Sequence, residues 1–184
     1  MNTSPELSSG LDALAVSIAP LRRRHLRGVM AIEQQVYPKP WTQSLFLSEL
    51  GLPSSRIYLV ARAARTVVGY AGIMLAPDEA HVTTIAVEPR WHGHHIATRM
   101  LLALTREAID RNFTALTLEV RLSSRGAQGL YRRFGLQPEG ARKDYYSNPV
   151  EDAVVMWVRD IHTPEYGELL DGLARRVSRA VGDA

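Results

Sequence analysis

The apolar residues of the chain recur with two periods, one typical of strands and one typical of helices. Alternating or continuous apolar runs predict strands, and six segments fit that description: VSIAPL, RIYLVARA, TVVGYAGIMLA, HVTTIAV, ALTLEV and DAVVMWV. A two-residue connection at Ala64 and Arg65 joins the second and third of these runs, which predicts a hairpin. The strand HVTTIAV ends at Glu88 and Pro89.

A period near 3.6 predicts helices between these runs. The first covers RHLRGVMAIEQQVY and stops at Pro38 and Pro40, because proline cannot continue a helix. A second helix begins after Thr42, which is its predicted N-cap. The segment SSRGAQGLYRRFG forms another, which Gly135 closes as a C-terminal cap. A long helix follows HVTTIAV and a short connection, and four of its residues share one apolar face: Ala97, Leu101, Leu104 and Ala108.

The predicted order of elements is β-α-α-β-β-β-α-β-α-β-β, which places a seventh strand between the last of these helices and DAVVMWV. Strands linked through helices tend to be parallel and strands linked by tight turns antiparallel, so we predict an α/β fold with a mixed sheet and helices on both faces. The chain has 184 residues, of which 46% are apolar and 22% charged, and this balance predicts one globular domain with one core.

Both ends of the chain differ in composition from its centre. Residues 1–15 are small and polar, which predicts a flexible tail before a domain of residues 16–160. Residues 161–184 predict a helical extension, because Pro164 suits a first turn and the arginines at its end complement the helix dipole. The apolar stripe of this helix can pack against its own domain or against a partner.

Composition narrows the class of protein further. No run of about 18 uncharged apolar residues is present, and the first twenty residues lack a basic segment followed by an apolar one, so we expect a cytoplasmic protein without a membrane partner. The absence of cysteine excludes thiolate nucleophiles, disulfides and Cys-ligated zinc. The net charge of +3 is mild, and the short arginine clusters are typical of solvated faces rather than of a nucleic-acid site.

The segment RWHGHHIATRM places His92, His94 and His95 around Gly93, between a predicted strand and a predicted helix. A metal site, a phosphate-binding turn and a polar turn all fit this composition. A metal site needs three or four converging ligands, and these histidines lie too close along the chain, so we predict no metal. A phosphate site needs only the unpaired N–H groups and the dipole of a first helical turn. The pattern alone does not separate phosphate binding from a polar turn, because one glycine at such a turn occurs in many folds.

Three separated segments resemble the GNAT acetyltransferases and, within them, the RimI-type N-terminal protein acetyltransferases. They are HVTTIAVEPRWHGHHIATRMLLALTREA, LTLEVRLSSRGAQGLYRRFGL and RKDYYSNPVEDAVVM, and the resemblance covers about residues 16–160. It implies a GNAT fold, in which a mixed, mostly antiparallel sheet of about seven strands carries helices on both faces. It also implies acetyl-CoA as the acetyl donor.

The family binds the pyrophosphate of acetyl-CoA on a loop of the form Gln/Arg-x-x-Gly-x-Gly/Ala. Here His92 stands where Gln or Arg is usual, His95 at the first glycine and Ala97 at the last position. A side chain at position 95 crowds the backbone, but main-chain N–H groups make the bonds, so we expect cofactor binding to survive. The resemblance implies these cofactor-binding residues: Ile85, Ala86, Val87, His92, Gly93, His94, His95, Ile96, Ala97, Thr98, Ser124 and Tyr131.

Two side chains carry the chemistry. Glu119 faces opposite Leu116 and Leu118, at the carboxyl end of its strand, where α/β sheets place their ligand crevices. By pattern alone it also fits a solvated carboxylate, and Tyr131, on an apolar helix face, also fits a core tyrosine. The family's LEVR and LY motifs imply that Glu119 is the general base, acting through water, and that Tyr131 is the general acid.

The segments YPKPW and RKDYYSNP are predicted to select the substrate. Both carry aromatic residues beside turn-forming residues, which suits a groove for an extended peptide, although aromatic residues at a turn can also cover the core. By resemblance, Tyr37, Trp41, Tyr145 and Tyr146 flank the incoming N-terminus. Asp144 binds its positive charge or stabilises the turn.

The resemblance implies direct acetyl transfer to the N-terminal amine of a protein, and an N-terminal alanine of a ribosomal protein is a target of the family. An α-amine has a reference pKa of about 7.7–8.0, so a modest base suffices. The lack of cysteine favours direct attack over an acyl-enzyme. Two alternatives stay open: an enzyme of this fold that acetylates lysine or a small amine, and a CoA-binding module in which His92 and His95 have ended catalysis. We expect a monomer or a weak dimer.

Overall fold

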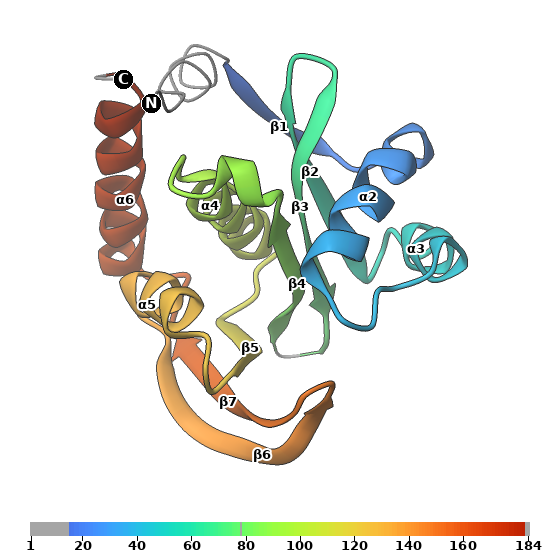
Figure 1. Ribbon diagram of the computed structural model, residues 1–184. Coiled ribbons are helices and arrows are strands. Elements are labelled where there is room, and N and C mark those ends of the chain that lie inside the picture. Colours follow the sequence, from blue (N-terminus) through green and yellow to red (C-terminus); the bar gives the residue numbers. More distant parts are fainter. Residues whose placement is uncertain (1–14, 78, 183–184) are drawn as a thin grey trace, which may run out of the picture.

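Seven strands form one sheet that lies between two layers of helices (Figure 1). The computed structural model describes residues 15–77 and 79–182, so residues 1–14 of the predicted tail lie outside the described residues. The strands are β1 Val16–Pro20, β2 Arg56–Ala63, β3 Thr66–Leu75, β4 Ala80–Val87, β5 Ala115–Arg121, β6 Gln137–Ser147 and β7 Val150–Arg159. The helices are α2 Leu26–Val36, α3 Gln43–Leu50, α4 Ile96–Asp110, α5 Arg125–Arg133 and α6 Pro164–Gly182, with short 3-10 turns η1 Arg23–His25 and η2 Pro89–Trp91.

The strands lie in the order β1-β2-β3-β4-β5-β7-β6. β4 and β5 are parallel, because α4 connects them, and the other neighbouring pairs in the described part of the chain are antiparallel. The order of elements is the one predicted from the sequence. The mixed, mostly antiparallel sheet with helices on both faces confirms the predicted fold class.

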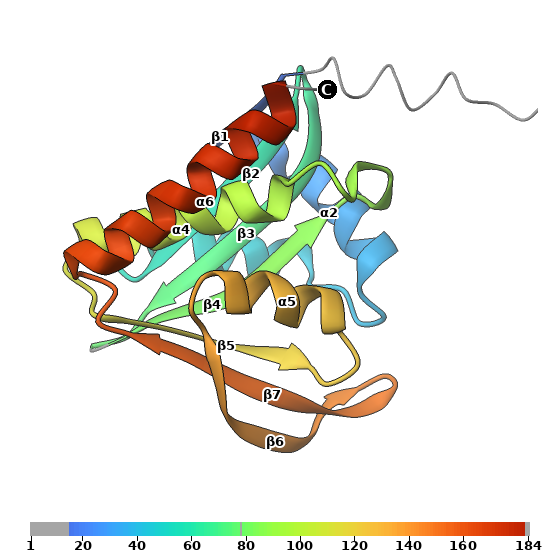
Figure 2. The same cartoon turned by 90° about the vertical axis from the view of Figure 1, so that its left-hand side faces the viewer.

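β4 and β5 pair only near their beginnings and then separate. The register joins Ala80–Val82 to Leu116–Leu118, and no later pair connects the two strands in the described residues. Against β3, the register of β4 shifts directly after Val82, where Thr83 is left without a partner. Such a bulge bends a strand, and Figure 2 shows β4 and β5 diverging. The sheet is therefore split along the carboxyl ends of its central strands.

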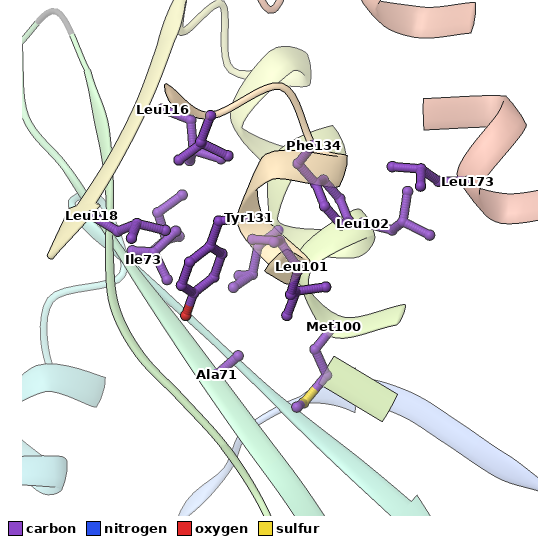
Figure 3. Packing of buried hydrophobic residues seen from close by; sticks show 14 of the residues in the cluster. Ala71, Ile73, Met100, Leu101, Leu102, Leu116, Leu118, Tyr131, Phe134 and Leu173 are labelled. Carbon is purple, nitrogen blue, oxygen red and sulfur yellow. The ribbon is translucent and has the colours of Figure 1, made fainter. Parts of the chain in front are cut away.

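Each face of the sheet has its own apolar core. On one face, Leu116 and Leu118 join side chains from α4, α5 and α6 in a single cluster, part of which is drawn in Figure 3. On the other face, Phe46 of α3 packs edge-on against Tyr58 and Tyr70, beneath α2. Because side chains alternate along a strand, residues that flank Leu118 point away from the first core.

Two helix ends form as their sequences predict. The Thr42 hydroxyl accepts a hydrogen bond of 3.2 Å from the Leu45 N–H and so caps α3. Gly135 follows α5 with φ at 82°, a left-handed conformation that glycine adopts without strain. The first cap fixes the loop before α3, and the second turns the chain from α5 into β6.

The segment RKDYYSNP differs from its expected turn conformation. Residues 142–147 belong to β6, and the turn to β7 comes only after Ser147. The pairing of β6 with β7 shifts between Arg142 and Tyr146, and Asp144 lies in this irregular stretch with φ at 51°. Its N–H donates to Oδ1 of Asp152 at 2.8 Å. A strand with an irregularity, rather than a turn, therefore presents the two tyrosines.

The C-terminal helix α6 packs against its own chain, beside α4 (Figure 1). Its apolar stripe, including Leu170 and Leu173, is buried in the same core as α4 and α5. The Tyr166 hydroxyl donates to the carbonyl of Phe134 at 2.9 Å, which ties the start of α6 to the end of α5. Of the two predicted alternatives, packing of the stripe against its own domain therefore accounts for these contacts.

Replacing Leu173 by alanine is expected to lower the free energy of unfolding by about 2–4 kcal/mol, because a buried leucine leaves a cavity that the core closes only in part. Leu173 is 3% exposed. Urea unfolding followed by circular dichroism measures the change. The matched control is Leu52→Ala at a 45% exposed leucine, where we expect less than about 0.5 kcal/mol. Equal effects at the two positions would contradict the packing of α6.

Candidate active site

A cavity of about 730 Å³ occupies the split between β4 and β5. Because the two strands no longer pair there, side chains from both faces of the sheet reach it. The lining includes eight residues singled out from the sequence: Tyr37, Trp41, Ile85, Glu119, Ser124, Tyr131, Tyr145 and Tyr146. Segments as distant in sequence as α2 and β6 thus meet at one site.

Glu119 lies in the wall of the cavity with both carboxylate oxygens engaged. Its Oε2 is 2.6 Å from Nε2 of His81, and its Oε1 accepts from Nε of Arg142 at 2.9 Å. The Glu119 side chain is only 6% exposed. A carboxylate placed on a cavity wall and oriented by two neighbours is a candidate general base.

Tyr131 reaches the cavity from α5, within the core that also contains Leu118 and Phe134. Figure 3 shows its hydroxyl oxygen turned away from Phe134. Burial raises the pKa of Tyr131, and the nearby phenols of Tyr37 and Tyr146 raise it further. The phenol therefore stays protonated at neutral pH and can give a proton to a leaving group.

The aromatic residues predicted to bind substrate surround the cavity. The Tyr37 hydroxyl donates to the carbonyl of Ile85 at 3.1 Å, and the Tyr146 hydroxyl donates to the carbonyl of Glu119 at 3.4 Å. Burial raises the pKa of Tyr146 to about 12. Tyr145, at 49% exposure, offers its ring to solvent. These rings form an aromatic rim next to the carboxylate.

Two further residues predicted to bind substrate, Trp41 and Asp144, lie in different places relative to the cavity. Trp41 lines the cavity and packs against Phe46 with ring centroids 5.2 Å apart. Asp144 is not among the residues that line the cavity, because it occupies the irregular stretch of β6. The structure therefore brings the four predicted aromatic residues together without this aspartate.

The histidine segment forms the connection between β4 and α4. Gly93 has φ at 86°, and His95, the residue before α4, has φ at 57°, so both adopt the left-handed conformation. Nε2 of His92 lies 3.1 Å from the carbonyl oxygen of Val87, which ties the loop to the end of β4. The loop does not line the cavity; it follows the strand that forms one cavity wall.

The first turn of α4 has the features of an anion site. No side chain caps the helix, and its first turn holds no acidic residue. The N–H groups of Ile96, Ala97 and Thr98 precede the first intrahelical bond and have no acceptor within the helix. A Cβ built on Gly93 would meet nothing within 4 Å. Free amides, the positive end of the dipole and open space fit a diphosphate.

Ser124 occupies the N-cap position of α5, but its side chain makes no capping hydrogen bond. The helix begins without it, since the Gln128 side chain donates to the carbonyls of Arg121 and Leu122 and holds the preceding turn. Ser124 lines the cavity, where its hydroxyl is free to contact a ligand.

Three residues of the site escaped the sequence-based prediction. His81 lines the cavity and contacts Glu119, and Arg142 contacts the other oxygen of the same carboxylate. The signal for His81 was a polar residue at the start of a strand whose other positions are mostly apolar. Glu33 is the third, and the signal for it was a carboxylate among the apolar positions of its helix face.

Glu33 holds the loop after α2 through a buried carboxyl group. Oε1 accepts from the N–H of Trp41 at 2.8 Å, whereas Oε2 is buried without a hydrogen-bond partner in the described residues. Burial raises the pKa of Glu33, and the bond from Trp41 opposes that shift. The carboxyl group thus fixes the YPKPW segment beside the cavity.

In residues 15–77 and 79–182, no three His, Asp or Glu side chains come together in a way that could hold a metal ion. The same residues contain no helix with the length and apolar character needed to cross a membrane.

A profile of the Acetyltransferase (GNAT) family matches residues 26–136, and the chain belongs to this family, whose members take the acetyl group from acetyl-CoA. The chain is 36% identical over 152 residues to the N-alpha-acetyltransferase RimI of Mycobacterium tuberculosis, a match that covers 79% of this chain and 93% of the relative.

Two solved structures share the fold. The ribosomal-protein-S18-alanine N-acetyltransferase of Escherichia coli superposes with a TM-score of 0.72 at 27% identity, covering 79% of this chain and 94% of that one. The PaiA N-acetyltransferase of Thermoplasma acidophilum, solved in complex with coenzyme A, gives a TM-score of 0.67 at 14% identity, with 79% and 99% covered. The second similarity concerns the fold alone.

Replacing His95 by glycine is expected to raise the free energy of unfolding by up to about 1 kcal/mol, because a left-handed conformation costs other residues about 1–2 kcal/mol and glycine gives back part of that gain as chain entropy. Denaturant unfolding checks this, with the neighbouring His94→Gly as control, where a loss of stability is expected. Calorimetry with acetyl-CoA should give a Kd within about threefold of wild type. A destabilised His95→Gly protein would contradict the observed loop.

The Glu33→Gln variant is expected to become more stable, relative to wild type, as pH rises. A raised pKa in the folded state means that the stability contributed by the protonated carboxyl is present at low pH and is lost as pH rises through the folded pKa. Glutamine keeps an acceptor for the Trp41 N–H without this loss. Unfolding measured from pH 5 to pH 8 tests the trend, and the exposed Glu107→Gln serves as control. If the difference in the free energy of unfolding between Glu33→Gln and wild type did not change with pH, this prediction would be contradicted.

Proposed function

We propose that the protein acetylates the N-terminal amine of a protein, with acetyl-CoA as donor. The observation that carries this proposal is the convergence of Glu119, Tyr131 and an aromatic rim on one cavity between the separated ends of β4 and β5. The RimI-type relatives support the choice of an α-amine. In line with the name of the Escherichia coli protein, we propose the N-terminal alanine of a ribosomal protein as substrate and the cytoplasm as location.

The amides at the start of α4, from His95 to Thr98, would hold the diphosphate of acetyl-CoA. The β4 segment Ile85–Val87 would hold the pantetheine arm, because its edge toward β5 is not used in pairing. Ser124 borders the same cavity from the start of α5. Bound there, acetyl-CoA supplies a thioester whose carbonyl carbon accepts the amine.

Glu119 prepares the nucleophile. An α-ammonium group must lose a proton before its nitrogen can attack, and Glu119 takes that proton through a water molecule in the cavity. The aromatic rim of Tyr37, Tyr145 and Tyr146 lines the path by which a peptide chain reaches this carboxylate.

Tyr131 serves the leaving group. Its phenol donates a proton to the departing sulfur, and its raised pKa keeps that proton in place until transfer. The chain has no cysteine that could form a thioester with the acetyl group. Direct attack of the amine is therefore the simplest mechanism for this cavity.

The test is mass spectrometry of a peptide that begins with alanine and carries one internal lysine. We expect acetylation at the α-amine alone, and Glu119→Gln should lower kcat by about 10²–10⁴-fold, the usual contribution of a positioned base. Glu107→Gln, at an exposed carboxylate on α4, is the matched control and should leave kcat unchanged. A second peptide with a blocked N-terminus should not react.

Three results would contradict the proposal. Acetylation of the lysine in the blocked peptide at the same rate would show that the enzyme does not recognise α-amines. Unchanged turnover in Glu119→Gln would remove the assigned base. Full activity on simple amines with no response to the peptide sequence would point to a small-molecule substrate instead.

A further inference from the structure

The hairpin formed by β6 and β7 extends past the end of β5 and borders the cavity. The last register pair between β5 and β7 joins Arg121 to Ala153, whereas β7 already begins at Val150. Four residues of the hairpin line the cavity: Tyr145, Tyr146, Ser147 and Asn148. Residues 145–151 are called the hairpin tip below. The position of this tip decides where the aromatic rim lies relative to Glu119.

Main-chain pairing connects the hairpin tip to the rest of the sheet through an irregular stretch. The register of β6 and β7 shifts between Arg142 and Tyr146. Beyond this shift, the register continues with the pairs Tyr146–Glu151 and Ser147–Val150. Toward β5, the N–H of Leu122 donates to the carbonyl of Asp152 at 3.1 Å. Because a register shift interrupts the ladder, side chains have a share in setting the position of the tip.

The Arg121 side chain contacts the strand, the turn and the second strand of the hairpin tip. Its guanidinium carbon lies 4.1 Å from the centre of the Tyr146 ring, in β6. Nη1 donates to Oε2 of Glu151, in β7, at 3.1 Å, and Nη2 donates to the carbonyl of Asn148, in the turn, at 3.4 Å. A planar guanidinium can cover an aromatic ring with its face while it donates along its edge, which an ammonium group cannot do.

The carboxylate that pairs with Arg121 is itself fixed. Oε1 of Glu151 accepts from the N–H of Ser123 at 2.6 Å, so Glu151 is tied to the residues that follow β5. The side chains of Arg121 and Glu151 are 25% and 17% exposed. Most surface ion pairs contribute little because both side chains move freely. Here one partner is held by a main-chain bond, so the pair keeps one geometry.

Tyr146 is the residue of the hairpin tip that reaches the assigned base. Arg121 and Glu119 lie at alternate positions of β5 and therefore point to the same face of the sheet. The Tyr146 hydroxyl donates to the carbonyl of Glu119 at 3.4 Å. The main chain of β5 thus holds the ring at its hydroxyl, and the Arg121 guanidinium covers its face.

We propose that Arg121 is a positioning residue that acts through Tyr146: it fixes the hairpin tip so that the Tyr146 ring forms the wall against which the first residues of the peptide substrate lie. This inference rests on the proposed function. It concerns the peptide and not acetyl-CoA. The turn that carries Ser124 is held by bonds to the main-chain carbonyl of Arg121, from the Ser124 N–H and the Gln128 side chain, and these bonds do not involve the guanidinium.

Two variants remove the contacts of the guanidinium. Arg121→Met keeps an unbranched chain without charge, and Arg121→Lys keeps the charge but not the planar group. The matched control is Arg159→Met in the same hairpin. The guanidinium carbon of Arg159 lies 4.8 Å from the centre of a Trp157 ring, and Arg159 pairs with Glu139. None of these three residues lines the cavity.

Steady-state kinetics with acetyl-CoA compare an alanine peptide with alanine amide, which offers the same α-amine without further residues. We expect Arg121→Met to raise the peptide KM about 5–20-fold, the range of a lost cation–aromatic contact. The peptide kcat should stay within about twofold of wild type, because binding shared by ground state and transition state affects KM alone. Arg121→Lys should raise the peptide KM in the same direction.

The companion measurements should show no such change. In Arg121→Met, kcat/KM for alanine amide and the Kd for acetyl-CoA should stay within about twofold of wild type, because neither ligand reaches the hairpin tip. Arg159→Met should have the peptide KM of the wild-type protein. A peptide KM that is unchanged in Arg121→Met, or raised equally in Arg159→Met, would overturn the inference.

Direct contact between Arg121 and the substrate is the competing explanation, since Arg121 also lines the cavity. A double-mutant cycle with Tyr146→Leu separates the two. In the background without the ring, Arg121→Met should change the peptide KM by less than about twofold, because the two residues act as one unit. A full effect of Arg121→Met in that background would overturn the inference and assign Arg121 to the substrate itself.

Hydrogen exchange followed by mass spectrometry tests the hold on the hairpin tip without reference to activity. In both Arg121 variants, the amides of residues 145–151 should exchange about tenfold faster than in wild type, because local opening of the tip costs less. Arg159→Met should leave their exchange unchanged. If Arg121→Met does not fold, Arg121→Lys serves for both measurements. Wild-type exchange of the tip in a folded Arg121 variant would overturn the inference.

Failure of the inference and failure of the proposed function give different results. If Glu119→Gln loses activity while the peptide KM of Arg121→Met is that of wild type, the inference fails and the proposed function stands. If the wild-type protein does not acetylate the α-amine of the alanine peptide, the proposed function fails, and with it the part of the inference that concerns the substrate.

Discussion

The site depends on the failure of β4 and β5 to remain hydrogen-bonded along their length. The extra residue Thr83 bends β4 directly after the last pair with β5, and the two strands separate from that point. A fully paired strand would have closed the middle of the sheet. Because it is open, Tyr131 from one face and Glu119 from the other border a single cavity. In the proposed mechanism, the base and the acid therefore reach the reactants from opposite faces of the sheet.

The loop before α4 departs from the expected family pattern in its side chains, while its backbone leaves amides without an acceptor at the start of the helix. His95 adopts a left-handed conformation that glycine would adopt at lower cost. The amides that follow it are uncapped and face no acidic residue in the first turn. The diphosphate would be held by these amides, so the identity of the side chain at position 95 matters more to stability than to binding.

Much of the fold could be predicted, because its signals are local. The hairpin at Ala64, the cap at Thr42 and the turn at Gly135 each follow from a few neighbouring residues. The contacts of Glu119 could not be predicted in this way. Its distance to His81 depends on the register of two parallel strands far apart in sequence, and its bond to Arg142 depends on an irregular strand that resembled a turn. The buried Glu33 was missed because only the folded loop brings the Trp41 N–H to it.

A crystal structure with a bisubstrate ligand, coenzyme A joined through an acetyl group to the α-amine of an alanine peptide, tests the central claim most directly. The split sheet predicts that the diphosphate lies on the first-turn amides of α4 and that the joined nitrogen lies between Glu119 and Tyr131. The peptide should leave past Tyr37 and Tyr146. A ligand bound elsewhere, or β4 and β5 drawn together over an empty cavity, would contradict it.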